Sequence, residues 1–324
     1  MDFSTRIDKL KSLMNGHDGF LITDSSDIFY YTGYKPLDKG FLLVLKRKRP
    51  VLFLSPLENE AETVKTCDVV FLEKLKEIVN YVKNKKIGFD EHNLSQYIYS
   101  KLKTKVKLRP ASDIIKKPML IKDNGEIEKI KKAVKITKEI LSYIYLLEKS
   151  EIEVSKEIKI EFLKNYVSEA FPTIVAAGKN SYYIHHRPNK KIITKKDLVI
   201  VDLGAKFKEY CADLARTFCF LPDTKRRKII EDVEEIQSEI IDSIEVGMKF
   251  MELQKLYEKL MKKKGYETKH AIGHSVGLSV HEKIDTIENN MVITIEPGIY
   301  IKNIGGCRKE DVVLIKNNKV RMLS

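Results

Sequence analysis

Ionisable side chains lie within or at the ends of apolar, strand-like runs in the second half of this chain. A charged group in such a run is costly to bury unless a counter-charge or hydrogen-bond partners compensate it. Five positions share this placement, and separate burial of all five without a common purpose would be improbable. They are four carboxylates and one imidazole, at Asp202, Asp213, His274, Glu296 and Glu310. The pattern therefore favours one shared cation site.

Two of the carboxylates are close in sequence. Asp202 closes the run LVIVD, and Asp213 follows eleven residues later. If a two-residue hairpin turn lies at Phe207-Lys208, the two aspartates face each other directly, with Cβ atoms about 4.5–5.5 Å apart. Like charges in that arrangement are destabilising, and a divalent cation between them would reverse the sign of the interaction. The alternative is that the turn lies elsewhere and one aspartate is solvated.

Histidines gather in the segment 270–282, which holds His270, His274 and His281. Glycines flank His274, so the backbone there can approach a metal or a substrate closely. Histidine is the commonest nitrogen ligand of protein metal sites. We expect one or two of the three to be ordinary hydrogen-bonded histidines.

The last two carboxylates admit different explanations. Glu296 ends the apolar run VITIE, where a carboxylate needs a partner. Period-2 alternation puts Arg308 and Glu310 on one face of a strand, so an internal Arg308–Glu310 ion pair explains Glu310 as well as metal ligation does. Oxygen-rich ligation with one nitrogen and no thiolate favours Mn, Co, Fe or Zn. Two such ions sharing a water would provide a nucleophile and a clamp for hydrolysis.

The chain is long enough, at 324 residues, for two domains. Residues 1–118 alternate short apolar runs with helical patterns, which is typical of an α/β domain. Residues 119–324 begin with a long amphipathic segment and continue with strand-like runs, which indicates an α+β domain with antiparallel pairing. Prolines and polar residues between 109 and 124 place the boundary near residue 118.

Composition narrows the class of protein. The net charge of +13 would suit a nucleic-acid partner, but the lysines are spread along the whole chain, so we do not expect one. No apolar run is long enough to span a bilayer and the start lacks the apolar region of a signal peptide, so we expect a cytoplasmic protein without a membrane partner. The four cysteines lack CxxC spacing and are expected to be reduced and buried.

These motifs resemble the pita-bread metallopeptidases, specifically the group of Xaa-Pro aminopeptidases and Xaa-Pro dipeptidases (prolidases). The resemblance spans most of the chain. It rests on FPTIVAAGKNSYYIHHRP, DLVIVDLGAKFKEYCADLARTF, HAIGHSVGLSVHE, TIEPGIY and GGCRKEDVVLI in the second domain, and on SSDIFYYTGY and GFLLVL in the first. It implies a pita-bread α+β domain at 119–324 after a smaller, creatinase-like α/β domain at 1–118.

The resemblance also implies roles for the five residues. Asp202, and His274 with Glu296, look like ligands unique to one or other of two divalent metal ions, while Asp213 and Glu310 look like bridging carboxylates. A hydroxide bridging the two ions would attack the scissile carbonyl. Manganese is the favoured metal, with Co, Zn and Fe as alternatives.

Further residues match the motifs of the same group. Glu296 also resembles its proton shuttle, and His281 resembles the residue that stabilises the tetrahedral intermediate. His185, in the stretch NSYYIHHRP, matches the histidine on the substrate side. His270 and Arg308 match groups that stand behind the metal ligands.

The resemblance implies removal of one residue before proline, and two departures bear on the substrate. Ile184 replaces a proline common before His185, and only fifteen positions separate His281 from Glu296, which resembles a shortened form of the loop bordering the substrate. That loop lacks the arginine with which prolidases help to hold a dipeptide's free carboxylate, although Lys283 could substitute.

We therefore expect a metal-dependent Xaa-Pro aminopeptidase that removes the N-terminal residue from peptides with proline in second position. The alternative is a Xaa-Pro dipeptidase (prolidase). A third possibility, of another class, is a non-catalytic pita-bread module that binds protein or nucleic acid. Homodimerisation is expected by analogy with the resembling group.

Overall fold

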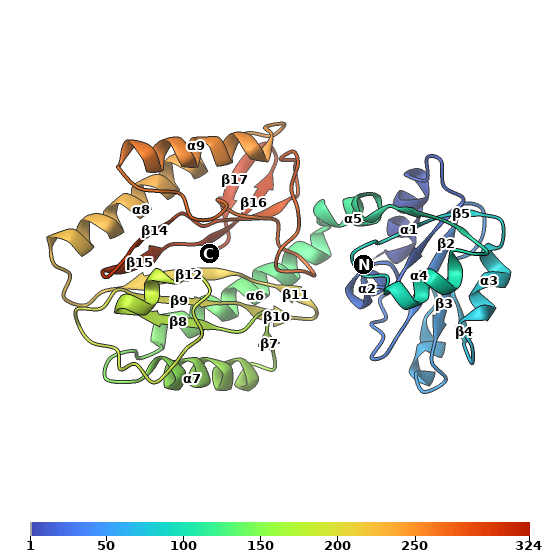
Figure 1. Ribbon diagram of the computed structural model, residues 1–324, viewed down its shortest axis with the longest axis horizontal. Coiled ribbons are helices and arrows are strands. Elements are labelled where there is room, and N and C mark those ends of the chain that lie inside the picture. Colours follow the sequence, from blue (N-terminus) through green and yellow to red (C-terminus); the bar gives the residue numbers. More distant parts are fainter. Residues whose placement is uncertain (1) are drawn as a thin grey trace. The chain divides into compact units, whose positions relative to one another are not determined.

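The computed structural model describes residues 2–324, whose contacts form two compact units, one ending at Met119 and one comprising Leu120–Ser324. The strands described in the first unit form a six-stranded sheet in the order β4-β3-β2-β1-β5-β6 (Figure 1). The strands β1 to β3 pair antiparallel and the outer strands pair parallel. Their bounds are β1 (Gly19–Ile22), β2 (Phe41–Leu45), β3 (Val51–Leu54), β4 (Asp68–Phe71), β5 (Lys86–Phe89) and β6 (Lys107–Pro110).

Helices cover this sheet, and this explains why β1, β2 and β3 are buried along their whole length. Apolar residues of α3 and α4, including Ile78, Val82 and Leu102, pack against Leu43 and Phe53 of the sheet. The helices of this unit are α1 (Phe3–Ser12), α2 (Ser25–Thr32), η1 (Asn59–Thr63), α3 (Lys76–Val82), α4 (Gln96–Leu102) and α5 (Ser112–Leu120).

The second unit has strands between two pairs of helices, α6 and α7 on one side and α8 and α9 on the other (Figure 1). Capping boxes begin α6, at Asp123 with Glu126, and α7, at Ser150 with Glu153. The helices are α6 (Asn124–Tyr143), α7 (Glu151–Lys164), α8 (Thr224–Asp242) and α9 (Phe250–Lys263), and the short η2 (Gly178–Tyr182) follows β8.

All strand pairings described in this unit are antiparallel, as the sequence predicts. The sheets have the orders β12-β9-β8, β11-β10-β7, β13-β16-β17 and β14-β15. Their strands are β7 (Ser168–Glu169), β8 (Ile174–Ala177), β9 (Val199–Leu203), β10 (Ala205–Phe207), β11 (Tyr210–Cys211), β12 (Leu214–Phe218), β13 (Val292–Ile295), β14 (Gly298–Ile301), β15 (Gly305–Arg308), β16 (Asp311–Lys316) and β17 (Lys319–Met322).

The core of the second unit holds these strands rigidly. On α8, buried residues recur at helical spacing at Ile229, Val233, Ile236 and Ile240, and they pack in one cluster with residues of β13 and β16. Burial of each such side chain contributes about 1.5–3 kcal/mol. Strands fixed in this way can hold ionisable side chains in place, which a mobile loop could not.

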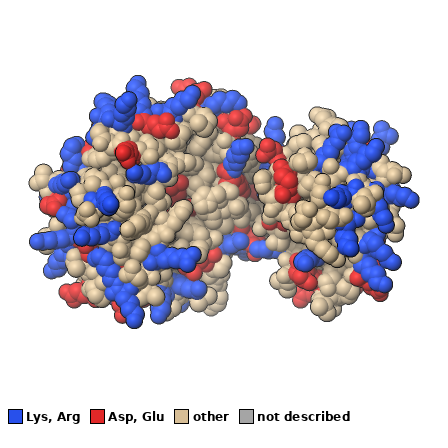
Figure 2. All heavy atoms as spheres, viewed as in Figure 1, with Lys and Arg blue, Asp and Glu red and all other residues tan. Residues whose placement is uncertain are grey.

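On one face of the molecule, the basic side chains are not gathered into a single stripe (Figure 2). On the face drawn in Figure 2, Lys and Arg side chains are distributed over both units with acidic groups among them. Within residues 2–324 no helix is both long and apolar enough to cross a membrane. The four cysteines are free, and three are buried as expected, whereas Cys219 is partly exposed.

Candidate functional site

The hairpin that carries the first two aspartates turns one residue later than expected. Phe207 pairs with Tyr210, so the turn residues are Lys208 and Glu209 and not Phe207 and Lys208. Both turn residues have positive φ, 46° and 72°, as a tight two-residue hairpin turn requires. A positive φ is especially unfavourable for a bulky side chain such as Phe207, which takes a strand position instead.

This shift changes the register, so the prediction that Asp202 and Asp213 face each other directly is wrong. Asp202 pairs with Ala215, and Asp213 lies two positions before that partner, at a diagonal position on the same face. The diagonal arrangement still gathers charge, because oxygens of Asp202, Asp213 and Glu310 all lie within 4.8 Å of one another. Glu310 reaches this group because its N–H donates to the carbonyl of Ala215 over 3.0 Å.

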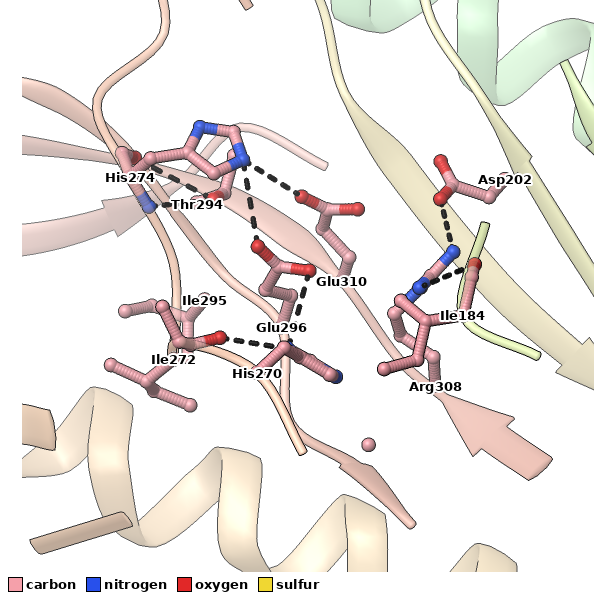
Figure 3. A network of polar contacts seen from close by, with 12 residues as sticks. Ile184, Asp202, His270, Ile272, His274, Thr294, Ile295, Glu296, Arg308 and Glu310 are labelled. Carbon is pink, nitrogen blue, oxygen red and sulfur yellow. Dashed lines mark hydrogen bonds and ion pairs between the residues drawn. The ribbon is translucent and has the colours of Figure 1, made fainter. Parts of the chain in front are cut away.

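His274 points toward Glu296 and Glu310 (Figure 3). Its Nε2 lies 3.5 Å from Oε1 of Glu296, 3.6 Å from Oδ2 of Asp213 and 4.0 Å from Oε1 of Glu310. The N–H of His274 donates to Oγ1 of Thr294 over 3.2 Å, which ties the histidine to β13. The structure thus brings together all five residues that the sequence singles out.

The cluster is strained electrostatically. Burial, followed by the charges of neighbouring carboxylates, raises the pKa of Asp213 and of Glu310 well above the ordinary value. Burial also raises the pKa of Asp202, against the opposing effect of Arg308, and raises the pKa of Glu296 to about 8. Divalent cations would stabilise the ionised forms of all four groups.

The donor atoms fit such cations. Oδ1 of Asp202 and Oε1 of Glu310 are buried and have no hydrogen-bond partner within the described part of the chain. Buried oxygens without partners are rare in proteins unless an ion or a water completes them. Burial lowers the pKa of His274 to about 4, so its imidazole is neutral at neutral pH, as a metal ligand must be. Acidic oxygens with one neutral nitrogen suit Mn, Co, Fe or Zn.

Arg308 does not form the internal pair with Glu310 that the sequence left open. Its Nη2 pairs instead with Oδ2 of Asp202, and both side chains are buried (Figure 3). Its Nη1 donates to the hydroxyl of Tyr300 over 3.3 Å and to the carbonyl of Ile184 over 3.4 Å. Arg308 therefore holds Asp202 from behind and fixes the backbone next to His185.

Tyr300 is a site residue that the sequence reasoning missed. Its hydroxyl lies 3.0 Å from Nε2 of His270, and Nδ1 of His270 lies 3.9 Å from Oε2 of Glu296. Tyr300 thus links Arg308 to His270. The available signal was alternation, since Glu296, Gly298 and Tyr300 are spaced by two and β14 begins directly after Glu296 and Pro297.

The remaining two histidines lie at the exposed side of the cluster. His281 is exposed, and its ring centroid is 4.1 Å from that of His274. Burial and then His185 lower the pKa of His281. His185 is itself exposed, beside His186, whose Nε2 lies 2.7 Å from the buried carboxylate of Glu151. Glu151 anchors this loop and was also missed.

Two family matches cover most of the chain. Residues 128–317 match metallopeptidase family M24, and residues 6–117 match the creatinase/prolidase N-terminal domain.

Curated and solved relatives agree with these matches. The chain is 34% identical to a Xaa-Pro dipeptidase of Pyrococcus furiosus, over 98% of this chain and 97% of the relative. Among solved structures, a prolidase from Pyrococcus horikoshii OT3 superposes with a TM-score of 0.93 at 31% identity, covering 98% of this chain and 97% of that one. An X-Pro aminopeptidase from Thermotoga maritima gives a TM-score of 0.85 at 25% identity and covers 97% of both chains.

Proposed function

Because this chain belongs to metallopeptidase family M24, and to its Xaa-Pro exopeptidases, we propose that it is a Xaa-Pro dipeptidase (prolidase). The expected fold, a pita-bread domain after a creatinase-like N-terminal domain, is confirmed by the family matches and by the similarity to prolidase structures. The observation that carries the proposal is the match to Xaa-Pro dipeptidases of Pyrococcus over nearly the whole length of both chains. This match supports a Xaa-Pro dipeptidase better than the Xaa-Pro aminopeptidase that the shortened loop favours.

We propose that the five clustered residues hold two divalent cations. Asp202, Asp213 and Glu310 form one group of close oxygens, and His274, Glu296 and Glu310 form a second, so Glu310 belongs to both. When bound, the cations would supply an activated water and polarise the scissile carbonyl. Manganese remains our preferred metal.

The side chains around the cations act on the proton and on the substrate. Glu296, whose carboxylate oxygens lie 3.5 Å from Nε2 of His274 and 3.9 Å from Nδ1 of His270, would accept and release a proton at those oxygens. His281, with a lowered pKa, is neutral and can donate a hydrogen bond to the carbonyl oxygen of the substrate as negative charge develops there. The nitrogen of a peptide bond before proline carries no hydrogen, so the site needs no hydrogen-bond acceptor for it.

The free carboxylate of a dipeptide needs a cationic partner. Lys283 is exposed and lies two residues after His281, in the loop where the sequence has no arginine. We propose that Lys283 binds this carboxylate, which would remove the objection to a dipeptidase.

A panel of substrates tests the proposed function. With Mn²⁺-loaded protein, we expect kcat/KM for Xaa-Pro dipeptides to exceed that for Xaa-Pro-Xaa tripeptides by about 100-fold or more. The Lys283→Met variant should raise KM for dipeptides about 10-fold, the loss of ~1.4 kcal/mol of binding, whereas Lys302→Met, another exposed lysine, should not. Preferential release of the first residue from tripeptides would instead establish an aminopeptidase.

A further inference from the structure

A buried ion pair lies behind the two histidines of the site. Nζ of Lys122 donates to Oε2 of Glu282 and to Oγ of Ser275, each over 2.7 Å, and Oγ of Ser275 donates to Oε2 of Glu282 over 2.9 Å. The side chain of Lys122 is 1% exposed and that of Glu282 is 13% exposed. We name these three residues the Lys122 cluster. A buried ion pair contributes little net stability, so this arrangement calls for another explanation.

The Lys122 cluster lies beside an isolated β-bridge, a pair of backbone hydrogen bonds between Ser275 and Glu282. The N–H of Ser275 donates to the carbonyl of Glu282 over 3.0 Å, and the N–H of Glu282 donates to the carbonyl of Ser275 over 2.9 Å. His274 and His281 directly precede these two residues. Because neighbouring side chains in extended strands point to opposite faces, the two imidazoles lie on the face opposite to the Lys122 cluster. The bridge therefore sets the separation of the imidazoles, whose centroids are 4.1 Å apart.

The surrounding backbone is shaped for this ion pair. A Cβ atom on Gly277 would lie 2.6 Å from Oε1 of Glu282 and 3.1 Å from Cε of Lys122, so glycine leaves the room that both side chains need. The N–H of Lys122 donates to the carbonyl of Asn290 over 2.9 Å, and the next residue, Asp123, caps α6. Lys122 is thus held by its own backbone and is a fixed support for the hairpin.

We propose that Lys122, acting through Ser275 and Glu282, is a positioning residue that holds His281 at its working distance from His274. The inference rests on the proposed function, since it assigns His281 to the substrate's carbonyl oxygen. His281 is exposed and lies in a short loop, so its position depends on the bridge beside it. Loss of a group that supports catalytic geometry commonly costs about 10–100-fold in activity.

Three variants separate positioning from plain structural support. Lys122→Met and Glu282→Gln each leave one buried charge unpaired, and the double variant leaves none. We expect kcat to fall about 10–100-fold in Lys122→Met, with KM changed less than about 3-fold. The double variant should regain the parental Tm but not the parental kcat. Lys131→Met, which removes an exposed pair with Glu128, is the matched control and should change neither.

Amide hydrogen exchange of the metal-free protein gives a readout that does not depend on turnover. The N–H groups of Ser275 and Glu282 should exchange faster in Lys122→Met and in the double variant, while those of β9 and β12 keep their protection. Ser275→Ala should show the same effect more weakly if Lys122→Met does not fold.

Two outcomes would overturn the proposal. One is a double variant that recovers the parental kcat together with its Tm, and the other is unchanged exchange at Ser275 and Glu282 in every variant. If the parent cleaves no Xaa-Pro substrate, the proposed function fails, while the exchange measurement still decides whether Lys122 holds the hairpin.

Discussion

The charges of single residues in the five-residue cluster have opposite effects on the stability of the metal-free protein and on the binding of cations. Asp213 is nearly inaccessible to solvent, and its pKa is raised by burial and then by the charges of Asp202 and Glu296. The same charges are what would attract cations. A substitution that removes one charge should therefore stabilise the metal-free protein and weaken its binding of cations.

The Asp213→Asn variant tests this opposition. It keeps the size of the side chain, so we expect the metal-free variant at pH 8 to be more stable than the parent, by ~1 kcal/mol, because a buried like charge is gone. The Kd for Mn²⁺ should rise at least about 100-fold, and turnover should be lost. Urea unfolding in EDTA and calorimetric titration with Mn²⁺ measure the two effects. A variant that is less stable without metal would contradict the account.

Arg308 shows what a missing partner costs. Arg308→Met removes the counter-charge of Asp202 and leaves a buried carboxylate unpaired, so the free energy of unfolding should fall by roughly 3–5 kcal/mol. The neighbouring Lys309 is the control, because its 3.8 Å pair with Glu234 is partly exposed and Lys309→Met should cost less than about 1 kcal/mol. Equal losses in both variants, measured by denaturant unfolding, would show that the Arg308–Asp202 pair is not special.

Among the elements, the hairpin formed by β9 to β12 contributes most to the site, because it carries both aspartates. Its turn uses two residues, Lys208 and Glu209, in a backbone conformation that favours glycine or asparagine. The turn therefore stores strain that sequence changes could relieve without touching the ligands.

Replacing Glu209 with glycine should stabilise the protein by ~1 kcal/mol, because glycine adopts a positive φ without steric cost. The partly exposed pair with Lys206 that is lost contributes little. Glu239→Gly, on the exposed face of α8, should instead destabilise by ~1 kcal/mol. Thermal unfolding of both variants checks these two predictions. A fall in Tm for Glu209→Gly would argue against a strained turn.

On the scale of the whole molecule, metal loading couples stability to pH. Without cations, the pKa of Glu296 is raised from 4.5 to about 8, so the stability that its protonated form contributes is present below pH 4.5 and is lost as the pH rises through about 8. Bound cations keep the carboxylates ionised, so the loaded protein does not suffer this loss.

The stabilisation of the whole protein by Mn²⁺ should therefore grow between pH 6 and pH 8. Thermal unfolding with Mn²⁺ and with EDTA, at each pH and with the same free metal concentration, gives the difference in Tm. In Asp213→Asn this difference should be small at both pH values. A difference independent of pH in the parent would mean that protons and cations do not compete for the cluster.

Homodimerisation, a cytoplasmic location and the lack of a nucleic-acid partner stay predictions.

The sequence by itself indicated the five ionisable residues that lie close together in the second unit. Carboxylates that interrupt apolar strands are visible locally, because strand periodicity and the cost of burying charge act over a few residues. The antiparallel second unit and the membership of the Xaa-Pro exopeptidase group followed from the same short motifs.

Only the tertiary structure decided how the residues pair. Asp202 pairs with Ala215 because the hairpin turn does not include Phe207. Arg308 pairs with Asp202, 106 positions away in the sequence, and not with the nearby Glu310. Lys122 reaches Glu282 across 160 positions. Periodicity along one strand says which face a side chain occupies, whereas its partner depends on packing between segments far apart in the chain, and that packing is a property of the whole fold.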